Sequence, residues 1–193
     1  MEIIKKMDSI SSYKDKIADL TKVSDVDHNI SFEFGNLIIS NPKEEHIPEL
    51  AELWANLATI QQLNNPVRYC FKREDKNWQN VVRHKMSKSQ NLLLVATTKD
   101  SPEVKGFLYL QTVTIPSSDL IIKGFIEDLY TKPQHRRKGI AHKMLEVAMC
   151  WSKLHGFKQI ELVSLLNSKD VISFYESFKQ LQEKEIDLEL VKL

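Results

Sequence analysis

Residues 126–143 read IEDLYTKPQHRRKGIAHK, a strand pattern that leads into the start of a helix crowded with cations. Apolar residues predict a strand up to Thr131, Pro133 ends it, and a helical pattern begins near Lys138. The cations near that start are Lys132, Arg136, Arg137, Lys138 and Lys143. Cations at the positive end of a helix favour a bound anion, and Gly139 would let a phosphate approach the backbone. A basic solvated loop or a nucleic-acid-binding patch would explain the same charges, so this segment alone leaves these interpretations open.

The hydrophobic patterns on either side of this segment predict a mixture of strands and helices. Residues 30–40 predict one strand kinked at Gly35, and Asn41 and Pro42 predict the N-cap and first residue of a helix. A polar and aromatic loop is expected at 61–73. The other expected elements are a helix near 78–86, strands at 91–97, 104–115 and 120–131, a helix at 138–155, a strand at 159–164, a helix at 168–178 and a strand at 185–192. Strand–helix–strand units occur only in the second half, which predicts an α+β (mixed α/β) fold with a central mixed, mostly antiparallel sheet flanked by helices.

The first 29 residues differ in pattern from the rest of the chain. Apolar residues three or four apart predict an amphipathic helix over residues 2–22, and the polar residues 23–29 follow it as a linker. We therefore expect an N-terminal helical extension over 1–29 and the main domain over 30–193. The extension would pack on its own domain, reach a partner subunit or lie loosely.

Composition limits the classes of function. The chain has 193 residues, of which 42% are hydrophobic and 27% charged, as expected for a folded globular domain rather than a disordered chain. Its 27 Lys and Arg nearly balance its 26 Asp and Glu, which argues against a surface built for nucleic acid or an anionic membrane. The two cysteines, Cys70 and Cys150, have no disulfide or zinc spacing. Without an apolar signal segment or membrane span, we expect a soluble, cytoplasmic protein with reduced thiols.

The segment 136–141 also carries a family resemblance. It fits the pattern Arg/Gln-x-x-Gly-x-Gly/Ala and resembles the pyrophosphate-binding loop of the GNAT superfamily of N-acetyltransferases. Residues 126–133 resemble the central strand of that superfamily, and 171–176 resemble its Ala-x-x-Phe-Tyr-Glu helix. The resemblance covers about 37–193 with the same order of elements. It implies the GNAT fold and an acyltransferase that moves the acetyl group of acetyl-CoA, without a metal, directly to a primary amine in a ternary complex.

The resemblance also implies which residues bind the cofactor. The pyrophosphate would bind the turn formed by Arg136, Arg137, Lys138, Gly139, Ile140 and Ala141, and the pantetheine arm would bind Leu129, Tyr130, Thr131 and Ser168. An open strand edge can pair with the pantetheine amides as an added strand would, and a splay or bulge at Leu129-Tyr130 would aim an N–H group at the oxyanion. The chain departs from the family at Thr131, where Val is usual, and at Arg137, where Gly is common. Ser168 replaces an asparagine, with Asn167 one position earlier, and the glycine expected after Phe178 is missing.

Two residues are the candidate catalytic groups. An alkylamine is protonated at neutral pH and must lose a proton before it attacks the thioester. Glu127 and Asp128 should point in opposite directions on a regular strand, and the resemblance favours Glu127 as the base, directly or through a water. The resemblance makes Tyr175 the acid that protonates the thiolate of coenzyme A. A carboxylate with a structural role and a packed aromatic ring are the alternatives for these two residues.

Several functional alternatives stay open at this stage. A GNAT-like module that binds coenzyme A with weak or no catalysis would suit the departures at Ser168 and after Phe178. A nucleic-acid-binding domain would use the basic segment 132–143, but that segment lacks interleaved aromatic residues, so we expect neither a nucleic acid nor a membrane partner. The acceptor amine is open, since the 61–75 loop and the strand hairpin would set its specificity. A homodimer, common in the superfamily, is open as well.

Overall fold

The computed structural model describes residues 30–64, 66, 77–115, 121–162 and 173–174. Its Cα positions form two compact units, Met1–Ile30 and Ser31–Leu193, and the description below concerns the second. The predicted helix over 2–22 and the predicted strand over 185–192 lie outside the described residues, and the expected division of the chain after residue 29 stays a prediction. Of the expected helix over 168–178, only Ser173 and Phe174 are described, and both are helical.

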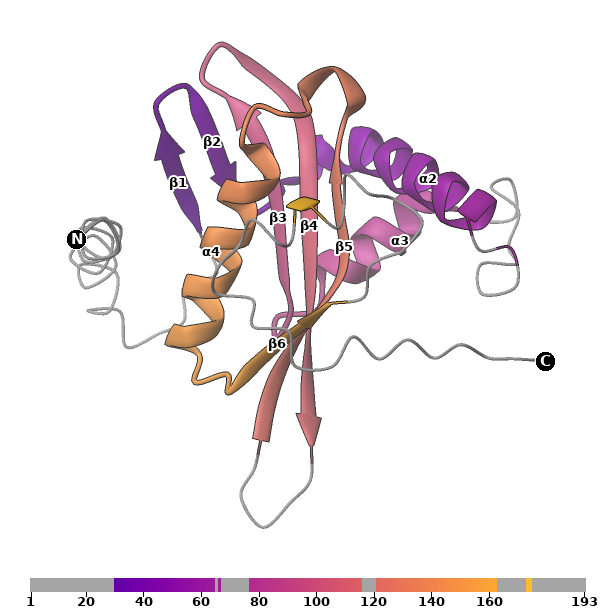
Figure 1. Ribbon diagram of the computed structural model, residues 1–193. Helices are drawn as coiled ribbons and strands as arrows, with labels where there is room; N and C mark the ends of the chain where they lie inside the picture. Colours follow the sequence, from indigo (N-terminus) through magenta and orange to yellow (C-terminus); the bar gives the residue numbers. More distant parts are fainter. Residues whose placement is uncertain (1–29, 65, 67–76, 116–120, 163–172, 175–193) are drawn as a thin grey trace. The chain divides into compact units, whose positions relative to one another are not determined.

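The described part of the second unit is a six-stranded sheet with helices (Figure 1). In chain order its elements are β1 (Ser31–Phe34), β2 (Leu37–Ser40), the 3-10 turn η1 (Glu44–His46), α2 (Ile47–Asn64), α3 (Trp78–Met86), β3 (Leu92–Thr98), β4 (Ser101–Ile115), β5 (Ile121–Thr131), the 3-10 turn η3 (Pro133–His135), α4 (Ile140–Leu154) and β6 (Gln159–Leu162). The strands lie in sequence order, and all neighbours are antiparallel except β5 and β6. The predicted mixed, mostly antiparallel sheet is confirmed.

Helices cover both faces of this sheet. Figure 1 shows α4 on one face and α2 with α3 on the other; α2 contacts β4, whereas α4 contacts β2 through β5. Trp54, Val82 and Phe107 belong to the core beneath α2 and α3, and the buried Leu94 and Leu108 point the other way because strand residues alternate. The central strands are therefore apolar on both faces. None of the helices in the described ranges is long and apolar enough to cross a membrane.

The segment 30–40 forms two strands, so the prediction of one kinked strand was wrong. Phe34 pairs with Leu37, and Gly35 and Asn36 form a two-residue turn between β1 and β2. Gly35 has a φ of +65°, which glycine adopts without steric cost. A two-residue Gly-Asn connection between alternating runs is a hairpin signal, so the sequence contained the information.

The helix that follows begins later than predicted and ends later. Lys43, not Asn41, is the N-cap of η1: its backbone N–H donates to Nδ1 of His46 at 2.9 Å. Burial lowers the pKa of His46, which favours the neutral ring that can accept this bond. Asn41 instead donates through Nδ2 to the carbonyl of Leu93, 3.1 Å away. At the other end α2 runs through Asn64, so the first residues of the expected 61–73 loop are helical.

An irregularity in the pairing of β4 with β5 positions the candidate site. Tyr109 lies opposite Asp128 and Leu110 opposite Ile126, so Glu127 is an extra residue in β5, a β-bulge. On the other side of β5, β6 pairs with residues 123–126 and goes no further within the described ranges. Residues 127–131 of β5 therefore combine a bulge with a strand edge that no described strand covers.

Candidate functional site

The turn between β5 and α4 has the backbone shape expected of an anion-binding loop. Arg137 and Gly139 both lie in the left-handed region, with φ of 61° and 77°. Gly139 is the N-cap of α4 and brings no side-chain oxygen to the first amides of the helix. Those amides need another acceptor, water or a bound anion. The φ of Arg137 also explains why glycine suits its position, because a residue with a Cβ is strained there.

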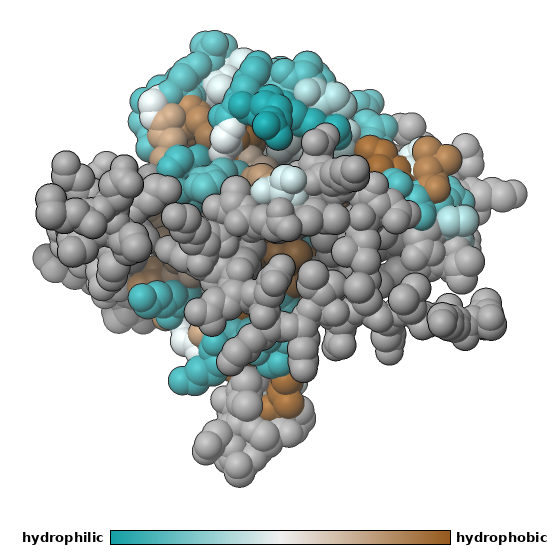
Figure 2. Space-filling view, in the orientation of Figure 1, coloured by the Kyte–Doolittle hydropathy of each residue, from teal (hydrophilic) through white to brown (hydrophobic). Residues whose placement is uncertain are grey.

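The cations around this turn divide into two groups. Lys132 is held away from solvent by Glu49 and by Glu103, whose Oε1 lies 2.8 Å from the ammonium, and the ammonium of Lys143 lies 2.7 Å from Glu146. Arg137 and Lys138 are exposed and form no ion pair with any described residue. Figure 2 shows hydrophilic side chains gathered over the end of the sheet where β5 leads into α4. Of the predicted cluster, Lys132 supports the turn, and Arg137 with Lys138 can face an anion.

The cofactor residues predicted on β5 lie along the uncovered edge. Tyr130 is buried, its ring centroid is 6.1 Å from that of Phe107, and it offers a ligand only its backbone. Leu129 and Thr131 are half-buried, and the carbonyl of Thr131 accepts a bond from Nε of Arg136 at 3.1 Å. The predicted irregularity at Leu129-Tyr130 lies two residues earlier, at Glu127. Ser168 and Tyr175 lie outside the described residues.

The bulge brings Glu127 and Asp128 to the same lysine, so the expectation that they point in opposite directions was wrong. The ammonium nitrogen of Lys85, on α3, is 2.7 Å from Oε2 of Glu127 and 3.7 Å from Oδ2 of Asp128. The amide of Gln111 on β4 donates to the same oxygen of Glu127. A regular strand would alternate the two carboxylates, and the extra residue cancels that alternation.

Glu127 and Asp128 nevertheless differ in accessibility. The side chain of Glu127 is 38% exposed, whereas that of Asp128 is 9% exposed. Nε1 of Trp54 donates to Oδ2 of Asp128 at 2.8 Å, and burial raises the pKa of this carboxyl group. A ligand from solvent can therefore reach Glu127, while Asp128 serves the packing around Lys85 and Trp54.

Aromatic rings complete the surroundings of the Lys85 ammonium. It lies 3.8 Å from the ring centroid of Tyr109 and 5.3 Å from that of Trp54, distances typical of cation–π contacts. The side chain of Lys85 is only 13% exposed. Two carboxylates and two rings thus form a site that holds an alkylammonium group.

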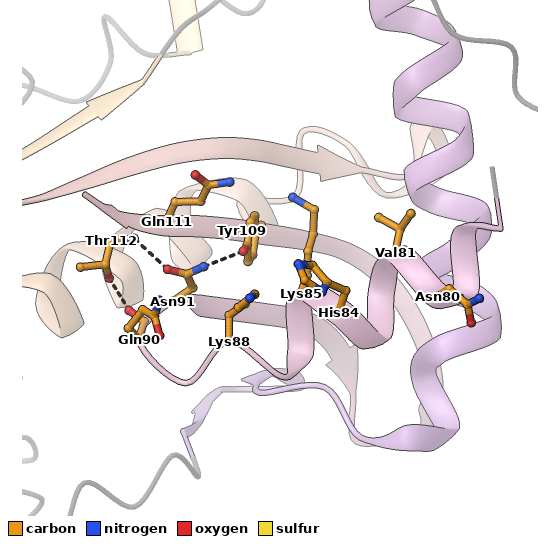
Figure 3. Close-up of a pocket in the computed structure, with 10 residues that line it drawn as sticks. All are labelled: Asn80, Val81, His84, Lys85, Lys88, Gln90, Asn91, Tyr109, Gln111 and Thr112. Atoms are coloured by element: carbon orange, nitrogen blue, oxygen red, sulfur yellow. Dashed lines mark hydrogen bonds between the residues drawn. The ribbon is translucent and has the colours of Figure 1, made fainter. Parts of the chain in front are cut away.

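A pocket of about 580 Å³ opens between α3 and β4 beside this cluster (Figure 3). Its lining includes Asn80, His84, Lys85 and Lys88 on the α3 side and Tyr109 and Gln111 on β4. One wall is fixed by hydrogen bonds, because Asn91 donates to the Tyr109 hydroxyl at 2.7 Å and accepts from the backbone N–H of Thr112 at 2.9 Å. The volume is in the range of small-ligand sites. Within the described ranges, no group of three His, Cys, Asp or Glu side chains is placed to hold a metal ion.

Sequence reasoning does not reveal most of this pocket. The helical pattern predicts only that Lys85 lays its stem along an apolar face, and Asn91, Tyr109 and Gln111 are predicted only as strand residues. These four residues come together because α3 packs beside β4, and no short sequence motif predicts that packing. The one local signal is a lysine on the apolar face of a short helix, where a charged residue needs a partner.

Comparison with known proteins identifies the family to which this architecture belongs. The family described as "Acetyltransferase (GNAT) family" matches residues 54–179, about two thirds of the chain. A search of curated proteins found no match.

Solved structures share the fold at low identity. A mutant form of the BH1408 protein from Bacillus halodurans matches with a TM-score of 0.66 and 17% identity, over 76% of this chain and 94% of that one. An aminoglycoside acetyltransferase from an uncultured soil metagenomic sample gives 0.61 and 17%, over 78% and 91%. A ribosomal-protein-alanine N-acetyltransferase from Brucella melitensis gives 0.57 and 19%, over 77% and 94%. At these identities the likeness shows the fold, and function must be argued from the site.

Proposed function

Because the chain belongs to the GNAT acetyltransferase family, we propose that it transfers the acetyl group of acetyl-CoA directly to a primary amine in a ternary complex. The observation that carries this proposal is the bulge at Glu127. It puts an accessible carboxylate at one end of the uncovered edge of β5, and the turn proposed to bind the pyrophosphate lies at the other end. Glu127 and Thr131 are four positions apart on the strand, roughly 13 Å at about 3.3 Å per residue. An extended thioester arm can span that length with its diphosphate at the turn.

The chain's own residues fit acetyl-CoA as a substrate. The first amides of α4, with Arg137 and Lys138, suit the pyrophosphate. The backbone of Leu129 to Thr131 can pair with the pantetheine amides as a further strand. Ser168 would contact the same arm. The thioester carbonyl then lies near the bulge, where a backbone N–H of β5 can stabilise the oxyanion.

Glu127 is the proposed base. The acceptor enters as an ammonium ion, gives one proton to Glu127 directly or through a water, and attacks the thioester carbonyl through its nitrogen. A C–N bond forms, the C–S bond breaks, and the thiolate of coenzyme A takes a proton from Tyr175. The attacking nitrogen loses its second proton as the amide forms, and this proton returns through water to the Tyr175 oxygen. Gln111 holds the Glu127 carboxylate in place, and the Lys85 ammonium shows that an alkylammonium can lie within hydrogen-bond distance of it.

A second candidate function is a module that binds coenzyme A and turns it over weakly or not at all. The ion pair between Lys85 and Glu127 favours it, because the proposed base already has a resident ammonium partner. Under the main proposal the acceptor shares or displaces this contact. Under the alternative Lys85 stays in place, and acetyl-CoA acts as a bound ligand.

Two measurements on the full chain separate these candidates. Calorimetry measures the affinity for acetyl-CoA, and release of free thiol measures transfer to a panel of primary amines. We expect binding together with acceptor-dependent thiol release. Binding without thiol release above hydrolysis for every amine would favour the module, and absence of acetyl-CoA binding would overturn both.

A further inference from the structure

The pocket beside Glu127 has an uneven distribution of charge. It is lined by two lysines, Lys85 and Lys88, and by His84, and none of the described residues that line it is Asp or Glu. The charge of Lys85 is offset by Glu127 and Asp128. The ammonium of Lys88 forms no ion pair with any residue in the described ranges, although its side chain is half-buried. The α3 side of the pocket therefore carries positive charge that the described residues do not neutralise.

Two further polar groups that line the pocket, the Tyr109 hydroxyl and the His84 imidazole, can also donate hydrogen bonds. The Tyr109 hydroxyl accepts from Asn91, and its own hydrogen has no acceptor among the described residues. Burial raises the pKa of Tyr109, so this hydroxyl keeps its proton and can donate it. Figure 3 shows His84 and Lys88 on the α3 side of the pocket, with Tyr109 facing them from β4. An ammonium, a hydroxyl and an imidazole around one space suit an anionic group.

Glu127 adds a negative charge next to the pocket, although it is not one of the lining residues. Gln111 and Lys85 both line the pocket and donate to Oε2 of Glu127, so the exposed carboxylate lies where these two residues meet. If the amine of the acceptor lies at Glu127, the rest of the acceptor molecule extends into the pocket toward Lys88. A molecule with a second positive charge there would be repelled, and one with a negative charge would be attracted.

We propose that the acceptor is a small amine that also carries a negatively charged group, which Lys88 binds while the amine lies at Glu127. This inference rests on the proposed acetyl transfer and narrows its acceptor. A carboxylate and a phosphate share the required chemistry, and the experiment distinguishes them. Polyamines and aminoglycosides, which carry several cations, are then poor acceptors.

The test compares acceptors of equal length that differ at the far end. The ω-amino carboxylates with three to six carbons are compared with their primary amides and with the corresponding diamines, by thiol release at saturating acetyl-CoA. A parallel pair, 3-aminopropyl phosphate and 3-aminopropanol, tests the phosphate. We expect the best anionic amine to exceed its neutral and cationic counterparts at least tenfold in kcat/KM. Equal rates, or faster transfer to the diamines, would overturn the inference.

Substitutions at Lys88 test whether this residue binds the negatively charged group of the acceptor. Lys88→Gln should raise KM for the preferred anionic amine at least tenfold with little change in kcat, and Lys88→Arg should restore most of the loss. Arg83→Gln is the matched control, because Arg83 is exposed on α3, close to Lys88 in the chain, and is not one of the residues that line the pocket. An unchanged KM in folded Lys88→Gln protein, or an equal loss in Arg83→Gln, would refute the role of Lys88.

A failure of this inference can be distinguished from a failure of the proposed acetyl transfer. If no amine supports thiol release, the proposed transfer fails, and calorimetric titration of the acetyl-CoA-saturated protein with the same amines still tests the pocket. The inference is supported if the amino carboxylates or the aminoalkyl phosphate bind more tightly than the diamines, and if Lys88→Gln removes this difference. Equal binding, or the absence of binding, contradicts it. If transfer occurs but favours the diamines, only the inference about the acceptor fails.

Discussion

The ammonium of Lys85 lies 2.7 Å from the carboxylate of Glu127, although the two residues are 42 positions apart in the chain. Lys85 belongs to a helix and Glu127 to the bulge of a central strand, so their pairing joins α3 to β5 at the proposed centre of reaction. The buried Asp128 lies 3.7 Å from the same ammonium. Removing Lys85 therefore affects one accessible and one buried carboxylate together.

The first prediction concerns the energetic coupling of Lys85 with Asp128. Lys85→Met keeps most of the apolar stem and removes the charge, which leaves the buried Asp128 without its nearest cation. We expect a loss of about 2–3 kcal/mol in the free energy of unfolding at pH 7. Asp128→Asn should offset part of it, with a coupling of at least about 1 kcal/mol in a double-mutant cycle. Urea denaturation of the four proteins measures this coupling.

Lys88→Met is the control for that cycle. Lys88 lies two residues beyond the end of α3 and pairs with no carboxylate of the described ranges, so its loss should change stability by less than about 0.5 kcal/mol. Additive effects of Lys85→Met and Asp128→Asn would show that the two groups do not interact across 3.7 Å.

The second prediction concerns the pH dependence of stability. Burial raises the pKa of Asp128 above its ordinary value of 3.8. Between the unfolded and folded pKa values the folded protein binds more protons than the unfolded one, so this group lowers stability as the pH rises. Asp128→Asn removes that contribution and keeps an oxygen that can accept from Trp54. The stability of Asp128→Asn relative to the native protein should rise from about pH 4 upward and then level off.

Glu103 provides a contrast of opposite sign. Hydrogen bonds from Lys132 and Lys105 lower its pKa from 4.5 to about 2. Its contribution is present above the unfolded pKa and is lost as the pH falls toward 2. Glu103→Gln should therefore be less stable than the native protein at neutral pH, and this difference should shrink as the pH falls from 4.5 to about 2. Denaturation curves from about pH 2 to about pH 8 test both variants. A pH-independent difference between Asp128→Asn and the native protein would contradict the buried-carboxylate account.

The third prediction separates backbone strain from ligand binding at Gly139. Gly139 and Gly35 both have positive φ, 77° and 65°, and a Cβ built on either meets no atom within 4 Å. Alanine at each should therefore cost a similar amount of stability, about 1–2 kcal/mol. At Gly139 the added methyl also occupies space where the pyrophosphate approaches. We expect at least a tenfold loss of acetyl-CoA affinity for Gly139→Ala and none for Gly35→Ala, measured by calorimetry. Equal affinities in the two folded variants would remove the turn from the binding site.

The same two glycines show how far local sequence predicts structure. The turn at Gly139 can be predicted because the cations and the helix start around it are contiguous in sequence. The turn at Gly35 is equally local, yet the alternation in the two short runs beside it also fits one continuous strand. Local patterns otherwise predict the described strands β3 to β6 and the helices α3 and α4 to within a few residues.

The candidate site is harder to predict because its parts depend on pairing between distant segments. The bulge at Glu127 has no signal in its own residues, since it is defined by which residues of β4 lie opposite. The contact of Lys85 with Glu127 depends in turn on that bulge and on the packing of α3. Strand alternation, applied without the bulge, therefore predicts the wrong directions for Glu127 and Asp128.

The fourth prediction concerns Tyr175, the proposed acid. A free thiol has a pKa of about 8.5 and tyrosine one of about 10, so a tyrosine can donate to the departing thiolate and stay protonated at neutral pH. Tyr175→Phe should keep acetyl-CoA affinity and the melting temperature, but lower kcat about 10²-fold or more. Steady-state kinetics with the best acceptor measure this effect. A near-native kcat would remove Tyr175 from the mechanism, and a large fall in melting temperature would favour a packing role.

The last prediction distinguishes Glu127 from Asp128 as the base. Glu127→Gln keeps an oxygen for Gln111 and cannot accept a proton from the acceptor. At neutral pH we expect kcat/KM to fall about 10²-fold with acetyl-CoA affinity unchanged. The residual rate should rise about tenfold per pH unit toward the acceptor's own pKa of roughly 10, because only acceptor already deprotonated in solution reacts. Asp128→Asn should change kcat/KM far less, since Asp128 is shielded by Trp54 and Lys85. The reverse order of effects, with both variants folded, would make Asp128 the base and leave Glu127 the partner that holds Lys85 in place.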